Sequence, residues 1–575
     1  MRNEYPRPDF RRDLWMSLNG QWDFDIKDGK SRKIQVPFVF QSKMSGIGEA
    51  FEVDRVVYKR SFKVPEEWKD KIIILNFGAV DYRCSVYING SCIGHHEGGQ
   101  TPFAFEINSY LTGGEEEIIV EVEDPLYDET IARGKQFWEK EPKFIWYTPS
   151  SGIWQSVWLE AVEKERLQNI YFTPDVDEGT AEIRYTLSKD TSLPCELTFR
   201  ISCEDKAIFN GTITAYERDG KLTVDIFNNK ALSGPIHFEG LCWSPENPVL
   251  FDVEATLSYD GEMKDKVISY FGMRKIHIEN GRIFLNNRPY YQKLLLDQGY
   301  WKESLITAPS DEAYKEDIIK AKAMGFNGVR KHEKVEDPRY LYWADKLGFL
   351  VWEGMASFWS YTPEAAGAFT KEWIDVIKRD YNHPCIVVWG MLNESWGVPN
   401  IYDNEMQQSF ANSLYYLAHS LDKTRLVIGN DGWEMTKSDI CAIHSYKHGA
   451  TEDIGQQKVF EDSLKSPEGF HNIVVRLPYA KGYEYSGQPI VLTEFGGISL
   501  GKNEEGWGYT NSSSGEEFLS TYERIIEAVY SSDSICGYCY TQLADVQQEV
   551  NGLLNEDREF KIEPEIIKKI NDRKK

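Results

Sequence analysis

Apolar residues in roughly the first 160 positions come in short runs that alternate with polar residues and are separated by turns. Residues 71–77 and 84–88 are examples, and Asn89-Gly90 follows the second run directly. Alternation with a period of two, broken by glycine-containing turns, is typical of short strands. We therefore predict that this part of the chain forms a β-sandwich.

A second stretch with the same pattern extends from residue 166 to about residue 275. Its clearest apolar runs are 181–187 and 222–226. A length of roughly 110 residues is that of an immunoglobulin-like β-sandwich. We expect a second, separate β-domain here.

Near residue 280 the pattern changes to strand, loop and helix, repeated along the rest of the chain. Ser310 has the position of an N-cap for a helix predicted over 311–324. Asp337-Pro338 begins the next predicted helix, with proline at its first position, and Gly348 ends it.

Eight short apolar segments alternate with these helices and loops. We predict strands at 290–296, 326–330, 349–352, 386–392, 426–429, 440–444, 489–493 and 535–541. Eight such units in roughly 295 residues predict a closed (β/α)8 TIM barrel. The predicted fold is thus multidomain β plus α/β, with domains at 1–165, 166–277 and 278–575.

Composition narrows the classes of partner. The 575 residues carry 65 Lys and Arg against 91 Asp and Glu, a net charge of −26, which argues against nucleic acid as a partner. The chain has no run of about 18 apolar residues, so we predict no membrane-spanning helix. The first residues show no apolar signal segment, and the nine cysteines are irregularly spaced. We expect a cytoplasmic protein with reduced thiols.

Two glutamates stand where a barrel carries its chemistry, at the carboxyl ends of predicted strands. Glu394 follows the fourth strand and Glu494 follows the seventh. Each could be a rim residue that forms an ion pair. Two carboxylates across one cleft are also what glycoside hydrolysis requires, and their separation decides between retention and inversion. The sequence leaves that separation open.

Several motifs resemble glycoside hydrolase family 2, which includes β-galactosidases, β-glucuronidases and β-mannosidases. Residues 380–389 with Asn393-Glu394 resemble its acid/base signature, and residues 490–497 resemble its nucleophile segment. Residues 18–22, 97–103 and 151–160 resemble parts of its N-terminal sugar-binding domain. The resemblance extends over nearly the whole chain and implies that the first β-domain is a jelly roll.

The resemblance implies roles for individual residues in a two-step retaining mechanism. Glu394 would be the general acid/base and Glu494 the nucleophile. Asn393 would bind the sugar 2-hydroxyl, Arg330 would hold the nucleophile carboxylate, and Tyr446 would contact it. Arg330 could instead form a structural ion pair.

Other residues near predicted strand ends are candidates for substrate binding, although each could equally serve packing or rim structure. His332 stands one position before the usual histidine of the family. The remaining candidates are His444, Asp297, Glu353, Trp433, Trp507, Tyr509 and Trp146.

The substrate is indicated by a departure from the family pattern. The β-glucuronidases of the family carry an Asn-x-Lys motif whose lysine pairs with the sugar carboxylate. Residues 549–551 of this chain are Glu-Val-Asn. An unpaired sugar carboxylate would be costly to bury, so we expect a neutral sugar, as in a β-galactosidase acting on chain ends. No metal or other cofactor is expected.

Several alternatives stay open. Within the family, a β-glucuronidase, a β-mannosidase or an arabinosidase is possible. A non-catalytic carbohydrate-binding protein on the same scaffold is a candidate of another class, and a metal-dependent hydrolase is a third. The resemblance also implies a homo-oligomer that acts on an oligosaccharide or glycoside.

Overall fold

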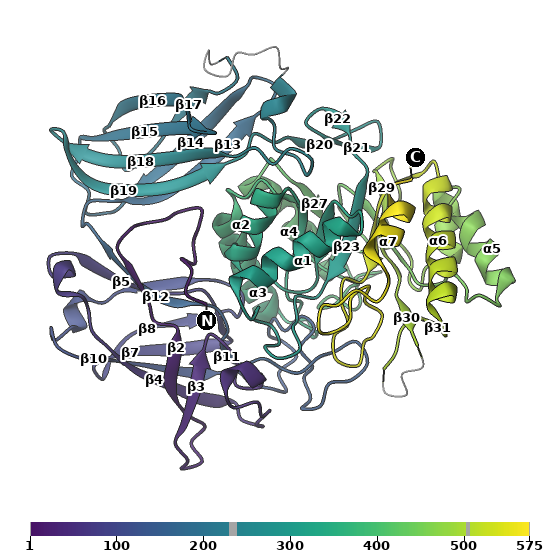
Figure 1. Ribbon diagram of the computed structural model, residues 1–575, viewed down its shortest axis with the longest axis horizontal. Helices are drawn as coiled ribbons and strands as arrows, with labels where there is room; N and C mark the ends of the chain where they lie inside the picture. Colours follow the sequence, from purple (N-terminus) through teal and green to yellow (C-terminus); the bar gives the residue numbers. More distant parts are fainter. Residues whose placement is uncertain (1, 229–237, 502–505, 574–575) are drawn as a thin grey trace.

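The computed structural model of the protein describes residues 2–228, 238–501 and 506–573. Figure 1 shows two β-sandwiches, one above the other, beside an α/β barrel. The N-terminal sandwich is drawn in purple and blue, the second in blue-green, and the barrel in green to yellow.

The N-terminal sandwich has two main antiparallel sheets and a short strand pair. One sheet has the order β1 (Trp15–Ser17), β12 (Val157–Val162), β5 (Ile72–Phe77) and β9 (Phe103–Glu106). The other has the order β3 (Arg32–Val36), β2 (Gly20–Asp25), β4 (Arg55–Phe62), β10 (Glu116–Glu123), β7 (Arg83–Ile88) and β8 (Ser91–Glu97). The pair is β6 (Val80–Asp81) and β11 (Gly152–Ile153).

The core of this domain lies between the two sheets. Trp22 and Val120 from one sheet and Leu75 and Leu159 from the other belong to one buried cluster. Strand β2 alternates between buried and more exposed residues. The period of two in the sequence therefore corresponds to one face in the core and one toward solvent.

The second sandwich also has two antiparallel sheets. One contains β13 (Leu167–Asp175), β14 (Thr180–Leu187) and β17 (Asp219–Asp225), and the other contains β16 (Lys206–Ala215), β15 (Cys195–Cys203), β18 (Phe251–Tyr259) and β19 (Glu262–Phe271). A small sheet of β20 (Ile276–Glu279), β21 (Arg282–Leu285) and β22 (Arg288–Pro289) leads into the barrel.

The barrel sheet has eight parallel strands. They are β23 (Gln292–Asp297), β24 (Gly328–Lys331), β25 (Leu350–Gly354), β26 (Ile386–Gly390), β27 (Leu426–Ile428), β28 (Cys441–Ser445), β29 (Ile490–Gly496) and β32 (Ile535–Thr541). All eight predicted strands are present, so the predicted fold class is confirmed.

The ring of strands is nearly closed. The ladder runs from β27 through β23 and β32 to β28, so β27 and β28 are its two ends. Asp439 joins these ends, because its N–H donates to the carbonyl of Val427 at 2.9 Å and its carboxylate accepts from the N–H of Val427 at 2.8 Å.

Seven α-helices and several short elements complete the described part of the chain. The helices are α1 (Asp311–Ala323), α2 (Pro338–Leu347), α3 (Pro363–Asp380), α4 (Glu405–Leu421), α5 (Ile454–Ser463), α6 (Gly515–Ser531) and α7 (Pro564–Asn571). The short strands are β30 (Ile498–Leu500) and β31 (Thr510–Ser512), and the 3-10 turns are η1 (Lys43–Ser45), η2 (Glu66–Trp68), η3 (Asn108–Tyr110), η5 (Phe238–Leu241) and η6 (Pro467–Asn472).

Local signals set the helix ends. The Ser310 side chain accepts a hydrogen bond from the N–H of Ala313, so it caps α1 as predicted. Asp337 caps α2, which begins at Pro338, and Gly348 ends it with a φ of 69°. None of the described helices combines the length and the apolar composition that crossing a membrane requires.

The domain limits drawn from the sequence stay predictions. The limit after residue 165 lies between β12 and β13, whereas the limit after residue 277 lies within β20.

Candidate active site

Glu394 and Glu494 lie together at the carboxyl ends of the barrel strands. Glu394 follows β26, and Glu494 is part of β29. One carboxylate oxygen of each lies within 4.8 Å of the other and of a ring nitrogen of His444. The structure thus brings the two predicted carboxylates close together in one cavity.

Glu494 accepts hydrogen bonds from two neighbours. The Nη1 of Arg330 donates to its Oε1 at 2.9 Å, and the hydroxyl of Tyr446 donates to its Oε2 at 2.7 Å. The Nε2 atoms of His332 and His444 each lie 3.5 Å from Oε1. The side chain of Glu494 is only 6% exposed. The two hydrogen bonds hold this carboxylate in one orientation.

Arg330 connects Glu494 to two further residues. Its Nε lies 2.7 Å from Asp431, and its Nη2 donates to the Oδ1 of Asn393 at 2.5 Å. Burial disfavours the charged guanidinium, but Asp431 and Glu494 outweigh burial and raise the pKa of Arg330. The carbonyl oxygen of Asn393 accepts from Arg330, so its amide N–H groups are the donors that it can offer to a substrate.

Glu394 is held by His444. The Nδ1 of His444 lies 2.8 Å from the Oε1 of Glu394, and its Nε2 lies 3.1 Å from Asp431. Burial lowers the pKa of His444, but Glu494, Asp431 and Glu394 outweigh burial and raise it to about 10. At neutral pH, His444 is therefore a charged donor to the carboxylates of Glu394 and Asp431.

The charge of His444 also bears on metal binding. Glu394, His444 and Glu494 form the one group of acidic and histidine side chains close enough to share a metal ion among the described residues. A metal ion bound at this group would have to displace the proton that His444 carries.

The backbone at Glu394 is strained. Glu394 and Ser395 have φ values of 48° and 58°, in the left-handed region that side chains other than glycine rarely adopt. Such strain often accompanies functional positions. In this turn the N–H of Glu394 donates to the carbonyl of Asp431 at 2.9 Å, which connects the segment after β26 to the segment after β27.

Tyr446 and Tyr509 form a stacked pair beside the nucleophile candidate. Their ring centroids are 3.4 Å apart and their planes differ by 2°. The hydroxyl of Tyr446 also lies 2.9 Å from the Oγ1 of Thr541. Tyr509 therefore supports the ring whose hydroxyl contacts Glu494.

His332 differs from His444 in charge. Burial and the charge of Arg330 hold the pKa of His332 well below its ordinary value, so its imidazole is neutral. Its Nδ1 lies 3.0 Å from the Oε1 of Gln298. The next residue, Glu333, stands where the family histidine was expected and also lines the cavity.

The N-terminal domain contributes Lys135 and Ile145 to the same cavity. Two further acids, Glu333 and Glu549, line it as well. Burial raises the pKa of Glu333 to about 7, against the opposing charge of Lys135. Burial likewise raises the pKa of Glu549, whose Oε2 accepts a 2.6 Å hydrogen bond from Tyr147.

Asp297 and Glu353 are not among the residues that line this cavity. The carboxylate of Asp297 contacts the ammonium of Lys331 at 2.5 Å, and that lysine is completely buried. Glu353 accepts from the N–H of Glu336 at 2.9 Å, and burial raises its pKa to about 8. The carboxylates of Asp297 and Glu353 are thus held outside this cavity by partners of their own.

The predicted aromatic residues surround the cavity rather than lining one platform. Trp433 lies beside Trp396, with ring centroids 6.1 Å apart. The indole N–H of Trp507 donates to the carbonyl of Phe144 at 2.8 Å, so it anchors a loop of the N-terminal domain. Trp146 belongs to that loop and packs against barrel tryptophans.

The sequence interpretation missed several residues at the site. Asp431 follows β27, so the strand-end signal used for the two glutamates could have found it. Trp396 stands two residues after Glu394. Lys135 gave no signal, because it lies in a loop of another domain.

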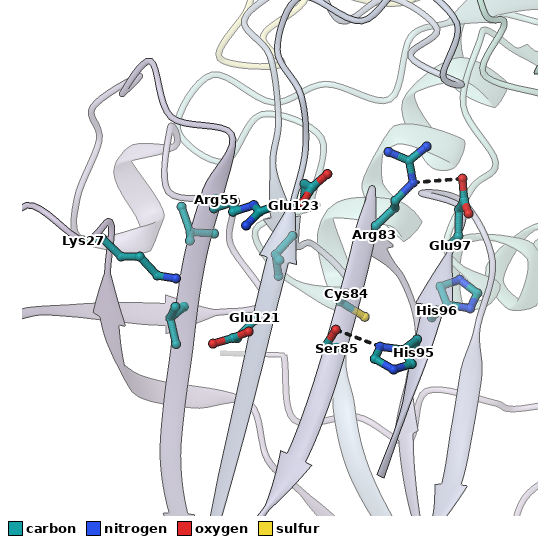
Figure 2. Close-up of a pocket in the computed structure, with 13 residues that line it drawn as sticks. Lys27, Arg55, Arg83, Cys84, Ser85, His95, His96, Glu97, Glu121 and Glu123 are labelled. Atoms are coloured by element: carbon teal, nitrogen blue, oxygen red, sulfur yellow. Dashed lines mark hydrogen bonds and ion pairs between the residues drawn. The ribbon is translucent and has the colours of Figure 1, made fainter. Parts of the chain in front are cut away.

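A second hollow lies on the exposed face of the six-stranded sheet. Figure 2 shows Arg83 paired with Glu97 at 3.0 Å and Ser85 with the Nδ1 of His95 at 2.8 Å. These groups belong to neighbouring strands β7 and β8. Their mutual pairing indicates a cross-strand contribution to the sheet.

Three models of one family match successive parts of the chain. "Glycosyl hydrolases family 2, sugar binding domain" matches residues 49–161, and "Glycosyl hydrolases family 2" matches residues 165–274. "Glycosyl hydrolases family 2, TIM barrel domain" matches residues 276–572, which is more than half of the chain. The chain belongs to glycosyl hydrolase family 2. The resemblance found in the sequence is thereby confirmed.

Curated relatives within family 2 carry different names. A putative β-glucuronidase of Formosa agariphila is 27% identical over 384 residues, 64% of this chain and 43% of that protein. A β-galactosidase of Thermoanaerobacter pseudethanolicus is 28% identical over 375 residues, 64% of this chain and 47% of that protein. The matches thus cover less than half of either relative.

Solved structures of family 2 enzymes match over the full length. A β-D-glucuronidase of Dictyoglomus thermophilum has a TM-score of 0.79 at 21% identity, with 99% of each chain covered. A β-galacturonidase of Eisenbergiella tayi has a TM-score of 0.75 at 21% identity, covering 99% of this chain and 98% of its own. At this identity the likeness concerns the fold.

Proposed function

We propose that the protein is a retaining β-glycosidase that removes terminal neutral sugars. The observation that carries this proposal is the pair of carboxylates, whose oxygens approach within 4.8 Å across one cavity. Retaining enzymes hold their two carboxyl groups about 5–5.5 Å apart, whereas inverting enzymes need about 6.5–9.5 Å. An oxygen–oxygen approach below 4.8 Å supports direct attack by Glu494 on the sugar rather than attack by an activated water.

In the first step, Glu494 attacks the anomeric carbon while Glu394 donates a proton to the leaving oxygen. The hydrogen bonds from Arg330 and Tyr446 orient Glu494 for this attack. In the second step, Glu394 takes a proton from water, the water oxygen attacks the anomeric carbon, and Glu494 leaves as a carboxylate. Asn393 is suited to bind the sugar 2-hydroxyl.

The cavity walls support action on chain ends. Lys135 and Ile145 come from the N-terminal domain, while the two glutamates come from the barrel. A cavity bounded by two domains accepts one terminal sugar more readily than the middle of a polymer.

The acidic lining supports a neutral sugar. Glu333 and Glu549 line the cavity in addition to the two glutamates of the mechanism. Carboxylates bind sugar hydroxyls as acceptors but repel a sugar carboxylate. A β-galactoside or a related neutral glycoside fits this lining.

Lys135 supports a second candidate, a uronide. It is a cation within the cavity, and it could pair with a sugar carboxylate in place of the lysine that residues 549–551 lack. The names of several structural relatives, β-glucuronidase and β-galacturonidase, point in the same direction.

A panel of nitrophenyl β-glycosides separates the two candidates. We expect the highest kcat/KM on a neutral glycoside, no effect of EDTA, and a product that first appears as the β-anomer by NMR. Lys135→Met should then change the neutral activity less than about tenfold. A preference for a uronide, lost in Lys135→Met, would overturn the neutral assignment. An α-anomer as first product would overturn retention.

The expected homo-oligomer stays a prediction.

A further inference from the structure

Aromatic residues occupy one sector of the barrel mouth. Trp359 follows β25, and Trp396 follows β26; both line the cavity that holds Glu394. Their ring centroids are 4.3 Å apart and their planes are inclined at 65°. Trp359 is 7% exposed, while Trp396 is half-buried.

Two tryptophans of the N-terminal domain extend this aromatic surface. Trp146 lies 5.3 Å from Trp359 and 5.9 Å from Trp396, measured between ring centroids. Trp138 lies 4.9 Å from Trp359 and 5.3 Å from Trp146. We call Trp138, Trp146, Trp359 and Trp396 the tryptophan wall.

The loop that carries Trp146 is fixed over the cavity. Lys143 and Trp146 exchange backbone hydrogen bonds of 3.1 and 3.0 Å, which closes a tight turn. Ile145 in this turn lines the cavity, and Phe144 is 63% exposed. The carbonyl of Phe144 accepts from Gln548 at 2.7 Å, so the barrel anchors the turn.

Polar groups occupy a different sector. Gln298 follows β23, Glu333 follows β24 and Glu549 follows β32, and these three strands are adjacent in the barrel. The tryptophans of the barrel follow β25 and β26, the next strands around the ring. The cavity thus has one side suited to hydroxyl groups and one suited to apolar rings.

The chemistry decides which part of the substrate meets each side. The leaving group departs next to the residue that protonates it, and Trp396 stands two residues after Glu394. We propose that the tryptophan wall binds the leaving group and selects an aromatic aglycone, so that the natural substrates are aryl β-glycosides. This inference rests on the proposed roles of Glu394 and Glu494.

An aromatic leaving group fits better than a second sugar. A sugar can stack one face on an indole, but its hydroxyls also need hydrogen-bond partners. On this side the cavity is lined by Trp359, Trp396 and Ile145, next to Asn393 and Glu394. Indole rings and an aliphatic side chain suit a planar apolar ring, while Glu394 serves its leaving oxygen.

The test compares leaving groups that share one sugar. With the best sugar from the panel, kcat/KM is measured for the phenyl and methyl β-glycosides. In Trp396→Leu and Trp146→Leu, we expect the phenyl value to fall about 5- to 10-fold and the methyl value less than 2-fold. Trp396→Phe should restore most of the phenyl preference. Trp343→Leu, a half-buried tryptophan on α2, is the matched control and should change neither value.

A second readout isolates the step. When 2,4-dinitrophenolate leaves quickly, hydrolysis of the glycosyl-enzyme limits kcat, and the leaving group is already gone. We expect this kcat to be unchanged in Trp396→Leu.

Equal losses on phenyl and methyl glycosides would overturn the proposal, as would a large fall in that kcat. A disaccharide that loses more than the phenyl glycoside would assign the wall to a sugar and overturn the aromatic selection. Failure of the proposed function is seen separately, as full activity in Glu494→Gln.

Discussion

The two glutamates at the barrel mouth differ in the neighbours that hold them. Glu494 accepts from Arg330 and Tyr446, one donor to each of its oxygens. Glu394 shares its cavity with two tryptophans, contacts His444, and its side chain is 15% exposed against 6% for Glu494. A nucleophile must stay fixed, whereas an acid/base must exchange protons with both leaving group and water. The difference between the two glutamates supports the proposed division of roles.

The largest expected effect comes from replacing Glu494, the proposed nucleophile. Glu494→Gln keeps the size of the side chain but cannot form the glycosyl ester, so kcat/KM should fall on the order of 10⁴-fold or more. Glu372→Gln is the matched control, because Glu372 is equally buried but lies in α3 and accepts from the N–H of Gln100. Steady-state kinetics on the best nitrophenyl glycoside measures both. Comparable losses in the two variants would contradict the assignment.

Replacing Glu394, the proposed acid/base, should give a loss of activity that depends on the leaving group. Glu394→Gln is expected to lower kcat/KM about 10²- to 10⁴-fold for the phenyl glycoside, because its leaving oxygen needs a proton. The 2,4-dinitrophenyl glycoside needs no proton, so its kcat/KM should change by less than about tenfold. A uniform loss across leaving groups would argue against acid catalysis by Glu394.

The donors to Glu494 provide a smaller effect. Tyr446→Phe keeps the stack on Tyr509 but removes the 2.7 Å hydrogen bond to Glu494. A hydrogen bond to a charged group contributes about 1.5–3 kcal/mol, so kcat/KM should fall roughly 10- to 100-fold. Tyr509→Phe keeps the stack and should retain near-wild-type activity. Equal losses in both variants would contradict a specific role for the hydrogen bond from Tyr446 to Glu494.

The smallest expected effect concerns stability against pH. The pKa of His444 is raised from 6.5 to about 10, so its ion pairs stabilise the fold fully below pH 6.5. That contribution is lost as the pH rises toward 10. Calorimetry from pH 6 to 10.5 should show a steeper fall in Tm for the wild type than for His444→Gln. Parallel curves would mean that His444 is not charged in the folded protein.

The sequence predicted the fold and the central pair because both depend on local pattern. Apolar strands followed by an acidic residue gave Glu394 and Glu494. The same pattern selected Asp297 and Glu353, which the structure does not bring into the cavity. Residues near the strand ends lie at different depths in the barrel. A buried partner such as Lys331 decides the depth at which a carboxylate lies.

The rest of the site depends on contacts between domains. Lys135 and Ile145 line the cavity, and Trp146 packs on Trp396, from a loop more than 200 residues before Glu394. No periodicity in that loop encodes where it will lie. Its position follows from packing against the barrel, through contacts such as Trp507 with Phe144.

The incomplete ring of strands has a consequence for evolution. Between β27 and β28 a regular ladder is absent: Asp439 contacts Val427 through its backbone N–H and its carboxylate, and the side chain of His444 contacts that of Asp431. This joint therefore uses His444, which also contacts Glu394, and Asp431, which also contacts Arg330. A substitution that retunes the proton chemistry here would also loosen the joint, so natural variation at these positions should be accompanied by compensating changes along the β27–β28 edge.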